Sequence, residues 1–174
     1  MKSRKKHLSI AVIIGIFLIG VDFFSKFLAN KMIPYHTSLD SQIPFLKFYL
    51  THNTGYHYIF GKIDNHLLWA LFGLTVGAIL IGSMIYSLLK DKLNNFYIKI
   101  YSIVLTLTIG AMGNVIEILF TGKATDFFLI RPFPWPTNVC DQYINAILYI
   151  ILPIILIRHL YIWIKEKKLS NETN

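Results

Sequence analysis

Four apolar stretches, each long enough to cross a lipid bilayer, constrain this chain more than any other feature. They cover about residues 8–28, 67–89, 98–120 and 141–164. A helix rises about 1.5 Å per residue, so roughly 20 residues cross a hydrocarbon core of roughly 30 Å. The pattern predicts an all-α membrane protein, a four-transmembrane-helix bundle that forms a single membrane domain over residues 1–174.

The composition agrees with a membrane class. Apolar residues make up 55% of the chain and aromatic residues 15%, and the mean hydropathy is +0.54. A net charge of +8 is also typical of nucleic-acid binding proteins, but here Lys and Arg gather at the ends of the apolar stretches and not along one polar face. We therefore expect no nucleic-acid partner.

The basic residues also indicate how the chain is oriented. Eleven of the 17 Lys and Arg residues lie at the N-terminus, between the second and third stretches, and at or beyond the end of the fourth. Cytoplasmic loops carry an excess of basic residues, so both termini should be cytoplasmic. The first stretch follows a basic N-terminus, as in a signal peptide, but no small-x-small cleavage site closes it, and we expect an uncleaved span.

Two segments should then lie outside the cytoplasm. Residues 29–66 are too polar to span, and the aromatic-rich Phe45–Leu50 is typical of a short strand, so we expect a small sheet at the outer membrane surface. Residues 121–140 contain three prolines around Trp135, which indicates an interfacial, turn-rich segment.

The sequence gives no sign of a metal or cofactor site. Cys140 is the only cysteine, and none of the six histidines forms an HExxH or Cys/His zinc pattern. We expect neither a metal nor a cofactor.

Carboxylates and asparagines gather instead at one depth. Four acids fall near the outer ends of the spans or in the second outer segment: Asp22, Glu117, Asp126 and Asp141. Apolar helices have no structural need for so many polar groups, so together with three asparagines (Asn53, Asn114 and Asn138) they predict a polar pocket at the membrane surface.

Each acid also has a simpler local explanation. Asp141 follows Asn138 and suits the N-terminal turn of a helix, and Asp22 can pair with Lys26 one turn further along.

Two carboxylates brought together in such a pocket cannot both ionise easily, so one keeps a proton while the other accepts one from water. This chemistry hydrolyses peptides without a metal or a covalent nucleophile. A serine mechanism is less favoured, since Ser25 has no evident base beyond Lys26, and Cys140 suits a packing role at a helix start.

At these residues the chain resembles the lipoprotein signal peptidases (signal peptidase II) along nearly its whole length. The matching motifs occur in the family's order and spacing: DFFSK at 22–26, NTG at 53–55, GAMGN at 110–114, TDF at 125–127 and NVCD at 138–141.

The resemblance implies an intramembrane aspartic endopeptidase that removes signal peptides from diacylglyceryl-modified prolipoproteins, cleaving before the lipid-modified Cys. The catalytic dyad would be Asp126 and Asp141. The implied substrate-binding and supporting residues are Asp22, Lys26, Asn53, Gly55, Asn114, Glu117 and Asn138.

The resemblance also implies a small extracytoplasmic β-cradle, with the protein in the bacterial inner membrane as a monomer. Its active site would lie on the periplasmic side and meet membrane lipid.

This chain departs from the family pattern close to the dyad. Glu117 and Ile118 stand where the family has an Asp-Arg pair, and His52 stands where Arg is usual. Two alternatives therefore stay open: a catalytically silent paralogue that binds lipoproteins or lipid, and a small proton-coupled carrier. A carrier needs polar residues through the full membrane depth, whereas the inner halves of these spans are almost purely apolar.

Overall fold

Long helices dominate the computed structural model, which describes residues 2–54, 56–57, 61–62, 65–90 and 93–172. Helices α1 (Lys2–Met32), α2 (His66–Lys90) and α3 (Asn95–Thr121) are followed by one continuous helix made of α4 (Val139–Ala146), the π-helical turn η1 (Ile147–Ile151) and α5 (Leu152–Glu172). Within the described residues, four helical segments are long and apolar enough to cross a membrane: Ser3–Met32, His66–Lys90, Asn95–Thr121 and Val139–Lys168.

The four spans confirm the expected multi-pass membrane fold. Large apolar side chains cover the outside of the bundle, as with Phe17 and Phe120, which are 67% and 81% exposed. In water such a surface would be costly, but lipid chains are as apolar as these side chains. The helices extend past the apolar stretches at both ends because their polar flanks continue the same backbone hydrogen bonding.

Glycines allow α3 to approach its neighbours closely. A Cβ atom on Gly15 of α1 would lie 2.7 Å from Ile109, and one on Gly73 of α2 would lie 2.9 Å from Val115. Since Gly77 also meets Met112 of α3, the Gly73 and Gly77 pair packs within the bundle.

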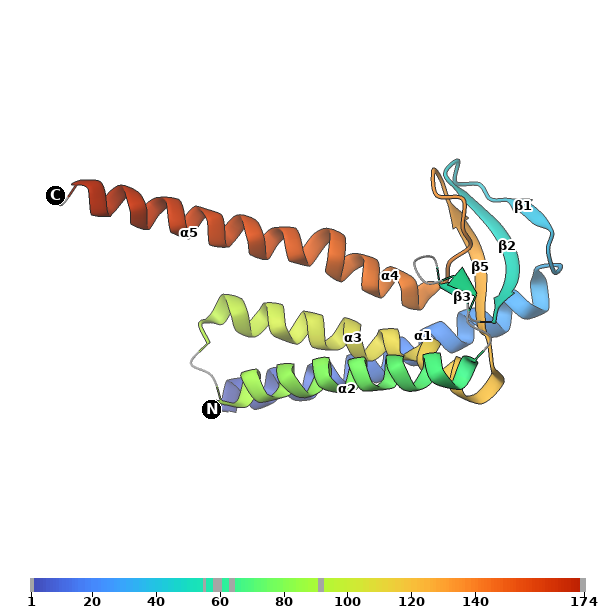
Figure 1. Cartoon of the computed structure of the whole chain (residues 1–174), viewed down its shortest axis with the longest axis horizontal. Coiled ribbons are helices and arrows are strands. Elements are labelled where there is room, and N and C mark those ends of the chain that lie inside the picture. Colours follow the sequence, from blue (N-terminus) through green and yellow to red (C-terminus); the bar gives the residue numbers. More distant parts are fainter. Residues whose placement is uncertain (1, 55, 58–60, 63–64, 91–92, 173–174) are drawn as a thin grey trace.

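A three-stranded antiparallel sheet lies at one end of the helices (Figure 1). Strand β2 (Leu46–Asn53) lies in its centre, between β1 (Ser38–Asp40) and β5 (Ala124–Ile130). The expected strand at Phe45–Leu50 is thus present and continues to Asn53. The short strands β3 (Tyr56–His57) and β4 (Gly61–Lys62) pair with each other.

Strand β5 differs from the sequence expectation, which described residues 121–140 as turn-rich. Its residues ATDFFLI are mostly β-branched or aromatic and pair well with β2. The expectation holds only after Arg131, where the prolines begin and Pro132 cannot donate to a sheet. This pairing matters because it sets Thr51 of β2 opposite Asp126.

Both ends of the chain lie at the end of the bundle opposite the sheet (Figure 1). There a hydrophobic core forms from four buried residues: Ala11, Leu88, Ile98 and Leu105. Apolar side chains of α1, α2 and α3 therefore pack together toward the terminal end, whereas the buried charged side chains lie toward the sheet.

Candidate active site

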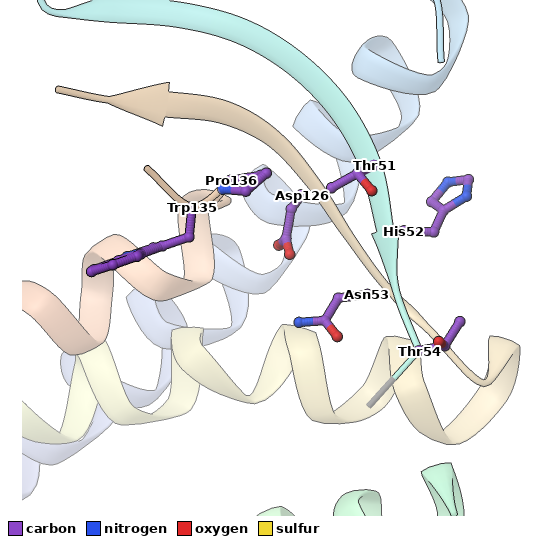
Figure 2. A pocket seen from close by; sticks show the side chains of 7 residues that line it. All are labelled: Thr51, His52, Asn53, Thr54, Asp126, Trp135 and Pro136. Carbon is purple, nitrogen blue, oxygen red and sulfur yellow. The ribbon is translucent and has the colours of Figure 1, made fainter. Parts of the chain in front are cut away.

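Asp126 projects from strand β5 into a cavity of about 570 Å³ at the sheet end of the bundle. Figure 2 shows its carboxyl group facing this space, whose lining residues are Thr51, His52, Asn53, Thr54, Asp126, Trp135 and Pro136. The register between β2 and β5 fixes which face of the sheet the Asp126 side chain lies on, and it therefore decides where this carboxyl group lies.

Asp141 lies in the first turn of α4, where it forms a capping box with Asn138. The Asn138 side chain accepts from the Asp141 N–H (3.2 Å), and Oδ2 of Asp141 accepts from the Asn138 N–H (3.1 Å). The local role expected for Asp141 is therefore real, and it also aims the carboxylate because both partners of the box are fixed.

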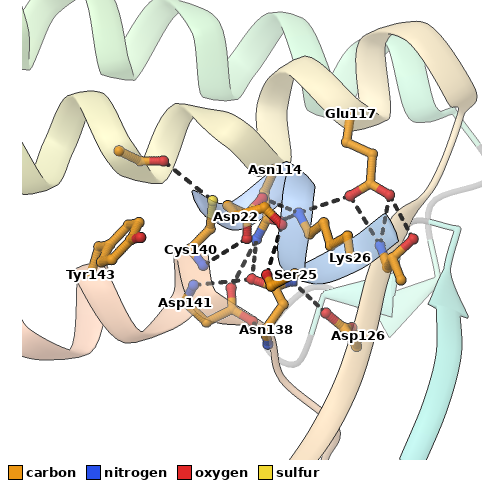
Figure 3. A network of polar contacts seen from close by, with 12 residues as sticks. Asp22, Ser25, Lys26, Asn114, Glu117, Asp126, Asn138, Cys140, Asp141 and Tyr143 are labelled. Atoms are coloured by element: carbon orange, nitrogen blue, oxygen red, sulfur yellow. Dashed lines mark hydrogen bonds and ion pairs between the residues drawn. The ribbon is translucent and has the colours of Figure 1, made fainter. Parts of the chain in front are cut away.

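Asn138 joins the two aspartates. Its Nδ2 donates to Oδ1 of Asp126 at 2.6 Å while its backbone holds Asp141 (Figure 3). Asn138 is fully buried, and a second cavity of about 390 Å³ is lined by both Asp126 and Asp141. Two carboxyl groups separated by 15 positions in the sequence thus face one space.

The two carboxyl groups have different surroundings. Asp141 accepts hydrogen bonds from Nδ2 of Asn114 (3.0 Å), the Thr137 hydroxyl (2.9 Å) and the Asn138 N–H. Among the hydrogen bonds of the described residues, Asp126 accepts only from the Asn138 side chain. Burial and the nearby negative charge of Asp141 raise the pKa of Asp126 from 3.8 to about 7.

A buried ionic cluster lies beside the dyad. Lys26 forms ion pairs with Asp22 (2.7 Å) and with Glu117 (2.8 Å), and its ammonium also donates to Oδ1 of Asn114. The expected helix pair of Asp22 and Lys26 is present, but both side chains are nearly inaccessible, unlike an ordinary surface pair. These residues meet the dyad through Asn114.

The remaining predicted site residues line the cavities or fall outside the described part of the chain. Asn53, at the end of β2, lines both cavities. Gly55 lies outside the described residues. Ile118 stands where the resemblance implies an arginine, and it lines the smaller cavity together with Trp69 and Phe72, so that wall is apolar.

His52 takes a polar place at the edge of the sheet. Its ring nitrogens lie 3.0 Å from Asn30 Oδ1 and 3.2 Å from Lys123 Nζ. Partial burial and the charge of Lys123 lower the pKa of His52. The position where the resemblance implies Arg thus holds a histidine that contacts both Asn30 and Lys123.

The alternative nucleophiles have other partners. The Ser25 hydroxyl donates to the backbone oxygen of Asp22 at 2.7 Å, and the buried Cys140 thiol donates to the backbone oxygen of Gly110 at 3.2 Å. Among the described residues, no group of three or more His, Cys, Asp or Glu side chains is arranged to hold a metal ion.

Sequence reasoning assigned no role to Thr125 or Thr137. Thr125 contacts Glu117 through both its N–H and its hydroxyl, and Thr137 donates to Asp141. In the sequence, the only indication of a role was that each threonine lies within four residues of Asp126 or Asp141. Their partners depend on the fold, so the signal alone could not assign them.

Comparisons with known proteins show what this chain resembles in sequence. Residues 13–168 match a family model described as signal peptidase (SPase) II. The chain is 32% identical over 137 residues to the lipoprotein signal peptidase of Caldanaerobacter subterraneus subsp. tengcongensis, covering 77% of this chain and 87% of that protein. It is 31% identical to the lipoprotein signal peptidase of Aquifex aeolicus, covering 83% of this chain and 81% of that one.

A solved structure titled as a bacterial membrane enzyme determined by the in meso method has the same fold. It superposes with a TM-score of 0.65 at 22% identity, covering 87% of this chain and 89% of the other.

Proposed function

This chain belongs to the signal peptidase II family, an aspartic peptidase family, and on that premise we propose that Asp126 and Asp141 are its catalytic dyad. The substrate would be a diacylglyceryl-modified prolipoprotein, cleaved before the modified Cys. The observation that carries the proposal is the bridging by Asn138, which fixes both carboxyl groups beside one cavity.

The hydrogen bonds support an asymmetric dyad. The donors around Asp141 favour its ionised form, since each hydrogen bond to a carboxylate stabilises the charge. Asp126, with its pKa raised to about 7, holds the shared proton near neutral pH. Such a pair titrates as a unit, and its surroundings decide where the single proton resides.

The reaction then follows in two steps. The Asp141 carboxylate takes a proton from water as the water oxygen adds to the scissile carbonyl carbon. Asp126 gives its proton to the amide nitrogen, and the C–N bond breaks to release the new N-terminus. One proton remains on the dyad, now on Asp141, and its return to Asp126 restores the starting state.

The cavity walls fit a substrate that arrives from the membrane. One wall is apolar, with Trp69, Phe72 and Ile118, and the dyad side carries Asn53, whose amide can bond a peptide backbone. Trp135 and Pro136 line one edge of the larger cavity (Figure 2) and would limit the access of bulk water from that edge.

We also propose that the sheet end faces away from the cytoplasm, that lipid surrounds the monomer, and that residues 1–174 act as one membrane domain. The excess of basic residues at the opposite end supports this orientation.

The distribution of buried charge disfavours a carrier. Among the described residues, the buried ionisable side chains apart from Cys140 are Asp22, Lys26, Glu117 and Asp126, and they gather at the sheet end. The buried Ser102 hydroxyl donates to a backbone oxygen of its own helix, so it offers no proton path.

The decisive test is cleavage of a diacylglyceryl-modified prolipoprotein by purified protein. Asp126→Asn and Asp141→Asn should each lower the rate roughly 10²- to 10⁴-fold, because each removes one proton-transfer group. Asp40→Asn is the matched control, since the Asp40 side chain is 82% exposed on the same sheet and should leave the rate unchanged.

The outcomes separate the alternatives. A folded wild type that cleaves nothing would favour the silent paralogue. Full activity in either dyad variant would remove the dyad assignment.

A further inference from the structure

The ionic cluster of Asp22, Lys26 and Glu117 is buried, yet none of the three is among the residues lining the two cavities that hold the dyad. Burying three charges is costly, and a buried ion pair is often no more stabilising than apolar residues of similar size. The cluster therefore calls for a role beyond stability.

The first arm of the cluster reaches helix α4. Oδ1 of Asp22 accepts from the Cys140 N–H at 3.1 Å, and Cys140 immediately precedes Asp141. This carboxylate belongs to α1, so a contact across 118 sequence positions fixes the first turn of α4. Gly113 leaves room for it, since a Cβ there would lie 2.9 Å from Asp22 Oδ2.

The second arm reaches strand β5. The Glu117 carboxylate accepts from the Thr125 N–H, at 3.1 Å to each oxygen, and from the Thr125 hydroxyl at 2.6 Å. Thr125 immediately precedes Asp126. The two arms are alike in one respect: each carboxylate accepts the backbone N–H of the residue just before one of the two aspartates. Figure 3 shows the Asp22 arm at Cys140.

Lys26 connects the arms. Its ammonium pairs with both carboxylates and donates to Asn114, whose amide donates in turn to Asp141 at 3.0 Å. All three bonding directions of one ammonium group are used, and each leads toward the dyad.

We propose that Lys26 is a positioning residue that sets the separation of the two aspartates, by tying together the carboxylates that hold Cys140 and Thr125. The inference rests on the proposed function, because it concerns the geometry of that dyad. In this chain Glu117, at the position where the family has Asp, links Lys26 to Thr125.

The first experiment compares Lys26→Met with Lys31→Met, the same substitution at an exposed position further along α1. We expect Lys26→Met to lower kcat roughly 100-fold while KM changes little, since a misplacement of about 1 Å can cost that much. Lys31→Met should match the wild type. Wild-type kcat in a folded Lys26→Met would overturn the proposal.

Milder variants guard against a Lys26→Met protein that does not fold. Thr125→Val removes the hydroxyl held by Glu117, and Thr125→Ser keeps it. We expect Thr125→Val to lower kcat roughly tenfold and Thr125→Ser to restore most of it. Equal activity in the two Thr125 variants would show that the strand arm has no positioning role.

The pH profile separates an effect of the cluster on the two aspartates from a general loss of folded protein. Lys26 lowers the pKa of Asp126 while Asp141 and Glu117 raise it. The alkaline limb of kcat should therefore move to higher pH in Lys26→Met and to lower pH in Glu117→Gln. A loss of folded protein alone would lower the measured rate at every pH and leave the alkaline limb of both variants at the wild-type pH.

An activity-independent readout keeps the proposal testable if the wild type proves inactive. Cys140 is the only cysteine, so ¹⁵N-cysteine labelling gives one amide signal at the start of α4. Its hydrogen exchange should accelerate in Lys26→Met and Asp22→Asn but not in Lys31→Met. Unchanged exchange in both would overturn the positioning role, whereas absent cleavage alone would overturn only the proposed function.

Discussion

Asn138 shows how much one residue contributes at this site. Its side chain caps α4 and donates to Asp126, while its backbone N–H holds Asp141. A serine could also cap the helix, but it has no amide group to reach Asp126. Asparagine is therefore suited both to capping α4 and to donating a hydrogen bond to Asp126.

Asp126 predicts the alkaline limb of the pH profile. With a pKa of about 7, it loses its proton as the pH rises through that value, and the dyad loses its acid. We expect kcat to fall about tenfold per pH unit above a midpoint near 7. Initial rates measured between about pH 5 and 9 would check this.

Variants of Asn138 test whether the alkaline limb belongs to Asp126. The Asn138 hydrogen bond lowers the pKa of Asp126, so both Asn138→Ser and Asn138→Ala should move the limb to higher pH. Serine keeps a cap, and Asn138→Ser should be more stable than Asn138→Ala by about 1 kcal/mol. A limb that stays in place in both variants would argue against Asp126 as the acid.

At the scale of elements, the site depends on how closely α3 approaches α1 and α4. Gly110 lies against Leu18 and Tyr143, and Gly113 lies against Asp22 and Cys140. Any side chain at these two positions would push apart helices that carry the dyad's supports. The glycines therefore serve close packing, and the polar network needs that packing to form.

Gly113→Ala tests this packing. Its Cβ would lie 2.7 Å from the Cys140 sulfur and 2.9 Å from Asp22 Oδ2, so atoms at the core of the network must shift. We expect a loss of about 1–3 kcal/mol in stability, together with slower cleavage. Thermal unfolding in detergent and initial rates would measure both effects.

Gly20→Ala is the matched control for that substitution. Apart from the adjacent residues and backbone of α1 itself, no heavy atom of the described residues lies within 4 Å of a Cβ built on Gly20. The Gly20→Ala variant should behave as the wild type does. Equal stability and activity in the two alanine variants would mean that the close approach at Gly113 is not needed.

Across the whole molecule, the two ends of the helices differ both in structure and in charge. The sheet and the dyad lie at one end of the bundle and both termini at the other (Figure 1). Basic residues predominate at the terminal end. The membrane orientation therefore decides the compartment in which any substrate must present its bond.

Cysteine labelling in intact cells can test the orientation. Cys140 is fully buried, so an introduced cysteine gives the signal with a membrane-impermeant maleimide. Ser38→Cys on β1 should be labelled in intact spheroplasts, and Ser3→Cys on α1 only after lysis. Labelling of Ser3→Cys without lysis would reverse the proposed orientation.

The membrane class, the four spans and the membrane depth at which polar groups gather could be predicted from the amino-acid sequence alone. These are local properties, since span length and hydropathy are read along one stretch of chain. The strand near Phe45–Leu50 was also predicted from the sequence. The strand that carries Asp126 was missed because it forms by pairing with β2, which is distant in the sequence.

Which polar groups contact one another, by contrast, depends on how the helices and strands pack. The link from Asp22 to Cys140 spans 118 positions and that from Lys26 to Asn114 spans 88, and such contacts follow from helix packing and sheet register. Motif resemblance selected Asp126 and Asp141 as candidates, whereas the fold assigned Thr125 to Glu117 and placed Lys26 between both arms. The physical reason is that apolar length is encoded locally, but a buried charge finds its partners only where distant elements pack together.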